Sequence, residues 1–249
     1  MPPDLAHGLL SPTFPAIAAA LVAGNRRDFS SDARALVQIL NPTLRVPAAP
    51  PELPSGPLVV AVNHYAHPGF HAMWIALAVS SCIDRPIRWV ITNEWTATSG
   101  LSQWVIPPAS RWVLRRIASC YGFLAMPPMP PRDQDTQARA LAVRKILAYM
   151  ISDREPTLGL APEGEESPTA ELQRPPPGSG RFLSHLAGCG AAFLPVGVFE
   201  TKDQLCVAFG KPLVLDPSTA TGREPDAPAE IVMQAIADLL PTALRGPYA

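Results

Sequence analysis

Three of the five histidines in the chain, His64, His67 and His71, lie close together in one short segment. The segment follows a run of branched apolar residues, Leu58–Val62, which is typical of a buried strand. In open parallel sheets, ligands bind outside the carboxyl ends of the strands, which is where such a segment lies. A neutral imidazole there can act as a general base toward a hydroxyl group. His64, which follows Asn63 directly after the predicted strand, is therefore the first candidate for chemistry.

Carboxylates are predicted at the same edge of the sheet. Pro162-Glu163-Gly164 ends a second short apolar run, and Glu165 and Glu166 follow it. Because the carboxyl ends of parallel strands open onto one edge, Glu163 can face the same cleft as His64. Two less specific interpretations stay open. Glu163 could be a solvated loop carboxylate, and His64 could be a structural histidine that caps the following helix.

The elements that must position these residues alternate between strands and helices. We expect helices at 15–24, 31–40, 72–80, 104–118, 136–152, 181–189 and 229–240, and strands at 58–62, 87–92, 121–126, 157–161, 192–199 and 205–209. This alternation predicts an α/β fold with a mainly parallel central sheet flanked by helices. Residues 1–50 are expected to form an N-terminal helical segment and linker, and residues 51–249 a single α/β domain. Ser30 or Ser31 is the expected N-cap of the second helix.

Composition narrows the class of protein. The net charge of -1 gives no electrostatic case for binding nucleic acid. Apolar residues make up 47% of the chain, yet no uninterrupted apolar run reaches the ~20 residues that cross a bilayer. The first residues lack the basic segment of a signal peptide, and the four cysteines are widely spaced. We therefore expect a cytoplasmic protein with reduced cysteines and neither a metal nor a cofactor.

The predicted helix at 104–118 is amphipathic, which leaves two interpretations. Tryptophan and isoleucine side chains at Trp95, Trp104, Ile106 and Trp112 would suit peripheral attachment to a membrane surface. Packing of this helix on the sheet is the simpler prediction.

Five short motifs lie in a characteristic order between about residues 55 and 215. They are Asn63-His64, Arg115-Arg116 leading to Gly122-Phe123, Ala161-Pro162-Glu163-Gly164, Leu194-Pro195-Val196-Gly197 and Phe209-Gly210-Lys211-Pro212. As a set, they resemble the glycerolipid acyltransferases, the family that includes the lysophosphatidic-acid acyltransferases. In that family a histidine deprotonates an acceptor hydroxyl, which attacks an acyl thioester without a covalent enzyme intermediate.

The resemblance implies a role for each matching residue. His64 would be the general base, next to Asn63, and Glu163 would lie on the acceptor side, with Gly164 permitting the tight turn. Glu165 and Glu166 would also border the acceptor. The acyl donor would be acyl-CoA or acyl-carrier protein as a co-substrate, the acceptor would be lipid-like, and the fold would be acyltransferase-like.

The chain also departs from the family pattern at two places. The family has an aspartate five residues after its histidine, where this chain has Gly69. After Pro-Glu-Gly the family continues Thr-Arg-Ser, where this chain has Glu165-Glu166-Ser167. The missing aspartate would orient the histidine and stabilise its cation. The candidates to replace it are His67, His71 and Glu94.

Three functions follow from these departures as alternatives. The first is acyl transfer to a hydroxyl or amine acceptor, with a neutral or amino acceptor preferred because of the two extra carboxylates. The second is a non-catalytic acyl- or lipid-binding protein on the same fold, since fold does not fix function. The third is a metal site formed by the three clustered histidines and the nearby glutamates, although Pro68-Gly69 interrupts the helical spacing that would align them.

Overall fold

The computed structural model describes residues 12–40, 44–47, 50–67, 70, 72–95, 102–152, 154–167, 169–201, 204–218 and 225–249. For residues 40 and 102–107 it describes the backbone only. Two residues of the predicted site, Gly69 and His71, lie outside the described residues.

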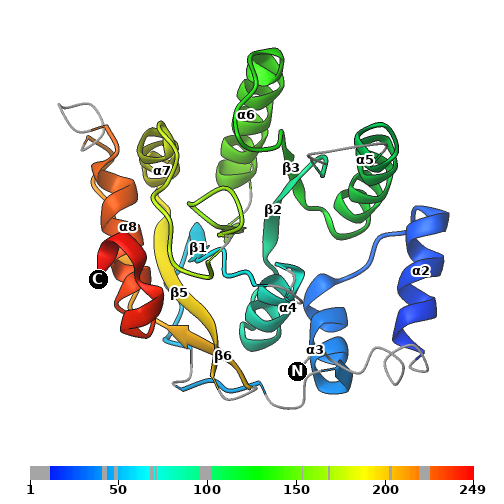
Figure 1. Cartoon of the computed structure of the whole chain (residues 1–249), viewed down its shortest axis with the longest axis horizontal. Helices are drawn as coiled ribbons and strands as arrows, with labels where there is room; N and C mark the ends of the chain where they lie inside the picture. The colour runs from blue at the N-terminus through cyan, green and yellow to red at the C-terminus, as the bar shows by residue number, and fades with distance from the viewer. Residues whose placement is uncertain are drawn as a thin grey trace.

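A single mixed sheet forms the centre of the fold (Figure 1). Its strands are β1 (Leu58–Val62), β2 (Arg88–Thr92), β3 (Leu124–Met126), β4 (Thr157–Leu160), β5 (Ala192–Thr201), β6 (Gln204–Phe209) and β7 (Leu213–Val214). They are ordered β3-β2-β4-β1-β5-β6, and β7 pairs with β5. Every pair from β3 to β5 is parallel, whereas β6 and β7 run antiparallel to β5. The predicted mainly parallel sheet is confirmed.

Strand β1 lies between β4 and β5, and all five of its residues are buried. A strand covered by helices on both faces must be apolar on both, which explains why Leu58–Val62 shows no polar alternation. Leu58, Val60 and Val62 pack toward one face, against helices α3 (Phe29–Leu40) and α4 (Met73–Cys82). Val59 and Ala61 pack toward the other face.

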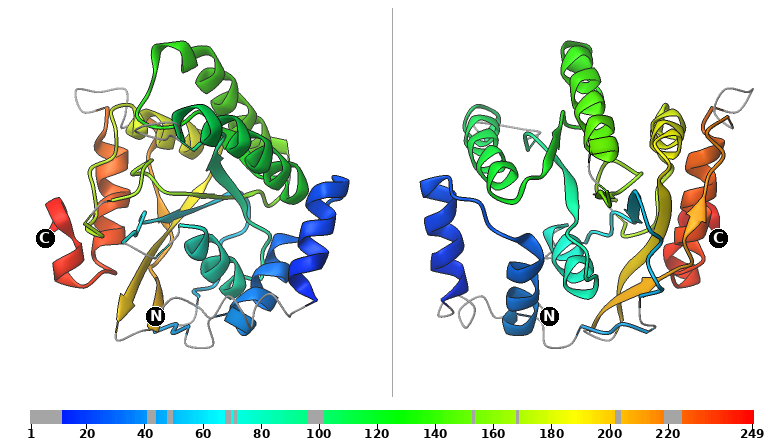
Figure 2. Two further views of the ribbon diagram at one scale, coloured as in Figure 1. Left: turned by 45° about the vertical axis from the view of Figure 1, so that its right-hand side comes forward. Right: turned by 180° about the vertical axis from the view of Figure 1, so that it is seen from behind.

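The second face is covered by α6 (Thr136–Ser152), α7 (Ser179–Gly188) and α8 (Ala227–Ala237). Helices α2 (Thr13–Ala23) and α5 (Ser102–Tyr121) contact each other at the β3 side of the molecule (Figure 2). No helix within the described ranges is long and apolar enough to span a bilayer. Short 3-10 turns complete the described structure, one before α6 and two near the C-terminus, at Asp133–Asp135, Thr242–Leu244 and Gly246–Tyr248.

Several predicted element boundaries differ from the structure, and for two of them the structure shows the cause. The strand expected at 121–126 is shorter, because α5 continues to Tyr121 and Gly122, with a φ of 70°, turns the chain before β3. The cap of α3 is neither Ser30 nor Ser31. Instead, the Asp28 side chain accepts a hydrogen bond from the Ser31 backbone N–H at 2.7 Å, and the helix begins at Phe29.

The N-terminal helices contribute to the same core as the sheet. Ala33, Leu36 and Val37 of α3 are buried against α4 and β1. The predicted division into a helical segment and linker at 1–50 and an α/β domain at 51–249 therefore stays a prediction.

Candidate active site

The site residues meet where the chain leaves two neighbouring strands in opposite directions. From β1 the chain passes through α4 to β2, and from β4 it passes through α7 to β5. Because β1 and β4 are adjacent, the order of the strands reverses between them, and the carboxyl ends at such a point are the usual ligand site of open α/β sheets. Asn63 and His64 follow β1, and Glu163 follows β4, so the structure brings these three residues together at this edge.

The Glu163 carboxylate links its own loop to two other backbone segments. One oxygen, Oε1, accepts a hydrogen bond from the His64 backbone N–H at 2.5 Å. The other, Oε2, accepts one from the Gln173 backbone N–H at 2.7 Å. The residue is only 2% exposed, so the interpretation of a solvated loop carboxylate is wrong. Its carboxylate is directed to the backbone, a geometry that does not support the acceptor-side role implied by the resemblance.

Burial raises the pKa of Glu163 to about 7, while the two backbone N–H groups act in the opposite direction. The turn that places this carboxylate is closed by a hydrogen bond from the Gly164 N–H to the Ala161 carbonyl at 3.1 Å. Gly164 has a φ of 76°, which strongly favours glycine. A tight turn is thus what allows Glu163 to point back under the end of β1.

Asn63 fixes the end of β1 on its other side, next to β5. Its side chain is buried and forms two hydrogen bonds with the backbone of Val198 in β5. The amide nitrogen donates to the Val198 carbonyl at 2.8 Å, and the amide oxygen accepts from the Val198 N–H at 2.7 Å. Asn63 therefore continues the pairing of β1 with β5 for one residue beyond the strand and holds the start of the His64 segment.

His64 is half-buried, and its backbone is held by the hydrogen bonds of Asn63 and Glu163. Its Nδ1 is fully buried and has no hydrogen-bond partner among the residues that the structure describes. Burial lowers the pKa of the imidazole, and the nearby carboxylates of Glu166 and Glu165 oppose this shift only in part. The ring is therefore neutral at neutral pH, the state that a general base requires.

His67 does not take the place of the missing aspartate. Its Nε2 pairs with the carboxylate of Glu200, near the end of β5. The His67 ring also lies edge-on to the ring of Tyr65 and tilted against that of Phe70. Sequence reasoning misses Glu200 as a partner because the predicted strand ends before it.

Glu94 is also engaged elsewhere. It is 6% exposed, and it forms ion pairs with Arg111 of α5 and with Arg132 in the loop after β3. The structure thus brings neither His67 nor Glu94 to the Nδ1 of His64, and His71 lies outside the described residues.

The described part of the chain contains no group of three or more histidine, cysteine, aspartate or glutamate side chains that could hold a metal ion. The metal-site alternative also requires His71, which is not among the described residues.

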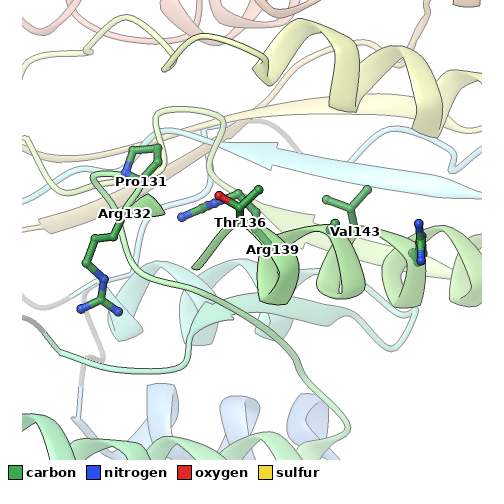
Figure 3. A pocket seen from close by; sticks show the side chains of 7 residues that line it. Pro131, Arg132, Thr136, Arg139 and Val143 are labelled. Atoms are coloured by element: carbon green, nitrogen blue, oxygen red, sulfur yellow. The ribbon is translucent and has the colours of Figure 1, made fainter. Parts of the chain in front are cut away.

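Two cavities adjoin helix α6 rather than His64. One, of about 460 Å³, lies along α6 beside the preceding loop (Figure 3). In Figure 3, Thr136, Arg139 and Val143 follow one another along the helix, and Arg132 extends away from it. The second, of about 370 Å³, lies between α5 and α6. Neither is lined by the residues at the end of β1.

The fold has a known counterpart. The crystal structure of the 1-acyl-sn-glycerophosphate (LPA) acyltransferase PlsC from Thermotoga maritima matches with a TM-score of 0.51, over 94% of this chain and 86% of that one. The two sequences are 12% identical, so the likeness is one of fold alone. The predicted acyltransferase-like α/β fold is confirmed at this level. No family model matches the sequence, and no curated protein matches it significantly.

Proposed function

We propose that the protein transfers an acyl group from a thioester donor to a hydroxyl or amine acceptor, with His64 as the general base. The observation that carries this proposal is the neutral, half-buried imidazole of His64 at the carboxyl end of β1, next to a backbone anchored by Glu163. The fold shared with an LPA acyltransferase supports the same class of reaction.

The proposed reaction needs one general base, the acyl acceptor and the thioester donor. The imidazole of His64 takes the proton from the acceptor O–H or N–H as that atom attacks the carbonyl carbon of the thioester. The tetrahedral intermediate then collapses, the C–S bond breaks, and the departing sulfur receives the proton from the imidazolium. The products are an ester or amide and a free thiol.

The charge near His64 bears on the choice of acceptor. Glu165 and Glu166 are exposed, and their carboxylates act electrostatically on the His64 ring. A phosphate on the acceptor would lie near these two negative charges and be repelled. We therefore propose a neutral or amino acceptor with a lipid-like chain rather than a lysophosphatidic acid.

Contact with a lipid surface is a further part of the proposal. Trp95 is 52% exposed and Trp112 is 55% exposed, so both can reach a membrane interface. The side chains of Trp104 and Ile106 lie outside the described residues. Flotation with liposomes tests this contact, and protein that stays entirely in the soluble fraction contradicts it.

One observation favours the alternative of a non-catalytic acyl-binding protein. The His64 Nδ1 has no partner in the described residues, and a histidine without an orienting group is a weaker base. The deciding experiment incubates the protein with a long-chain acyl-CoA and a panel of neutral, amino and phosphate acceptors. Thiol release together with an acylated acceptor, detected by mass spectrometry, is the expected result. Binding of acyl-CoA without either product favours the non-catalytic alternative.

A further inference from the structure

Helices α5 and α6 are both positively charged. Both contain only basic charged residues, with three on each helix and no aspartate or glutamate. The whole chain has a net charge of -1, so these two helices carry more positive charge than the chain as a whole. Both helices pack against β3, at the end of the sheet farthest from β6. Such an excess of positive charge attracts anions and raises their local concentration.

The cavity between these helices collects two of the charges. Arg115 extends from α5 and Lys145 from α6, and both line the cavity while remaining exposed. Neither forms an ion pair with a carboxylate among the described residues. Arg111 lines the same cavity, but its guanidinium is already paired with Glu94. Arg115 and Lys145 thus face one space with like charges and, within the described ranges, no counter-ion.

Alanines from α5, β3 and α6 also line the cavity, at Ala118, Ala125 and Ala142. Most of the residues that line the cavity are exposed, so an anion can reach the two cations directly from solvent. Arginine also recognises phosphate oxygens through paired hydrogen bonds. A phosphate group is the anion that this arrangement suits.

The position of the cavity decides which phosphate it suits. Asn93, at the carboxyl end of β2, lines the cavity, and β2 is separated from β1 by β4 alone. Neighbouring strands lie about 4.8 Å apart, so this end of the cavity is roughly 10 Å from the end of β1 along the sheet edge. That separation is too large for a phosphate bonded next to the reacting acceptor atom. It suits a phosphate at the far end of a long arm whose thioester lies at His64.

We infer that the cavity between α5 and α6 binds the phosphate of a phosphorylated pantetheine arm, the part that coenzyme A and acyl-carrier protein share. This inference rests on the proposed acyl transfer, because it assigns the cavity to the donor of that reaction. The site is distinct from the acceptor's, and Arg115 and Lys145 are its binding residues.

The test measures binding and activity separately. Coenzyme A, holo-acyl-carrier protein and pantetheine without phosphate are titrated into the full-length protein by calorimetry. The variants are Arg115→Ala with Lys145→Ala, and Arg144→Ala as the matched control. Arg144 is the neighbour of Lys145 on α6, carries the same charge and lines the other cavity. All three side chains are exposed, so the substitutions should leave the fold intact.

The double variant is expected to bind coenzyme A or the carrier protein about tenfold more weakly or worse, as for a lost charge-assisted hydrogen bond. Arg144→Ala should bind as the wild type does, and pantetheine should be insensitive to all the changes. Tighter binding of coenzyme A than of the carrier protein identifies free coenzyme A as the source of the arm, and the reverse identifies the carrier protein. Equal affinity of the wild type and the double variant for both phosphorylated ligands overturns the inference.

Failure of the proposed function is distinguishable from failure of this inference. A His64→Ala protein that binds coenzyme A normally but releases no thiol separates the chemistry from the phosphate site. If the double variant binds both phosphorylated ligands as tightly as the wild type and still releases thiol, the acyl transfer is supported. The cavity is then not part of the donor site. Phosphate-dependent binding without any thiol release supports the cavity and contradicts the acyl transfer.

Discussion

The Oε1 atom of Glu163 accepts a hydrogen bond from the backbone N–H of His64 at 2.5 Å, across two adjacent parallel strands. The bond joins the end of β4 to the end of β1. It fixes the backbone of the candidate base without occupying its ring. The carboxylate is thus a positioning group, and its own ionisation affects the free energy of unfolding.

The stability of the protein should depend on pH through Glu163. Its pKa is raised to about 7 in the folded protein, against 4.5 as the reference for the unfolded chain. Between these values the folded state keeps a proton that the unfolded state has released, so the free energy of unfolding falls as pH rises. The loss is on the order of 3 kcal/mol, since one pKa unit corresponds to about 1.4 kcal/mol.

Glu163→Gln is expected to remove this fall, because the amide does not titrate. Urea unfolding of both proteins at pH 5 and pH 7.5 measures it. The lowered pKa of His64 acts in the opposite direction, with stability lost as pH falls below 6.5, and it contributes to both proteins. An identical pH dependence in the wild type and the variant contradicts the prediction.

Asn63 should matter to stability more than its position in a loop suggests. Asn63→Leu removes both hydrogen bonds to Val198 and leaves a buried N–H and a buried carbonyl without partners. We expect a loss of about 2–4 kcal/mol in the free energy of unfolding. Urea unfolding measures it, with the exposed Asn25→Ala as control. A loss no larger than that of the control contradicts this role.

Gly69→Asp tests the unsatisfied Nδ1 of His64. In the resemblance, Gly69 stands where the family has its orienting aspartate, and Nδ1 is the buried atom that lacks a partner in the described residues. An aspartate is expected to raise thioester turnover by roughly tenfold or more, because it would orient the ring and stabilise its cation. Gly69→Asn is the matched control without charge. Equal turnover in the two variants, both folded by circular dichroism, counts against the prediction.

The acceptor preference should follow the charge at Glu166. Glu166→Arg is expected to raise the ratio of lysophosphatidic acid to neutral acceptor use by roughly three- to thirtyfold. Unit charges about 4 Å apart interact by about 1 kcal/mol in water, and the substitution reverses the sign. Glu155→Arg, which makes the same charge change before β4, at its opposite end, serves as control. The ratio of product formation with one acyl-CoA donor measures the effect, and an unchanged ratio contradicts it.

The sequence predicted the sheet because its strands are short, apolar and buried on both faces, as in Leu58–Val62. It also predicted that His64 and Glu163 share one edge, since both follow parallel strands. It did not reveal that Glu163 binds backbone N–H groups, because a loop glutamate gives no sign of its burial. Nor did it reveal the pairing of His67 with Glu200, or of Asn63 with Val198, since residues so far apart in the chain meet only after the sheet forms.

The role of His64 as the base is tested most directly by thiol release from acyl-CoA in the presence of a neutral or amino acceptor. His64→Ala is compared with His185→Ala, which removes an exposed histidine from α7. We predict a fall in turnover of about 10²–10⁴ for the His64 variant, as for a lost general base, with its fold intact by circular dichroism. The His185 variant should retain wild-type turnover. A His64→Ala protein that releases thiol within a few-fold of the wild-type rate would contradict the proposed mechanism.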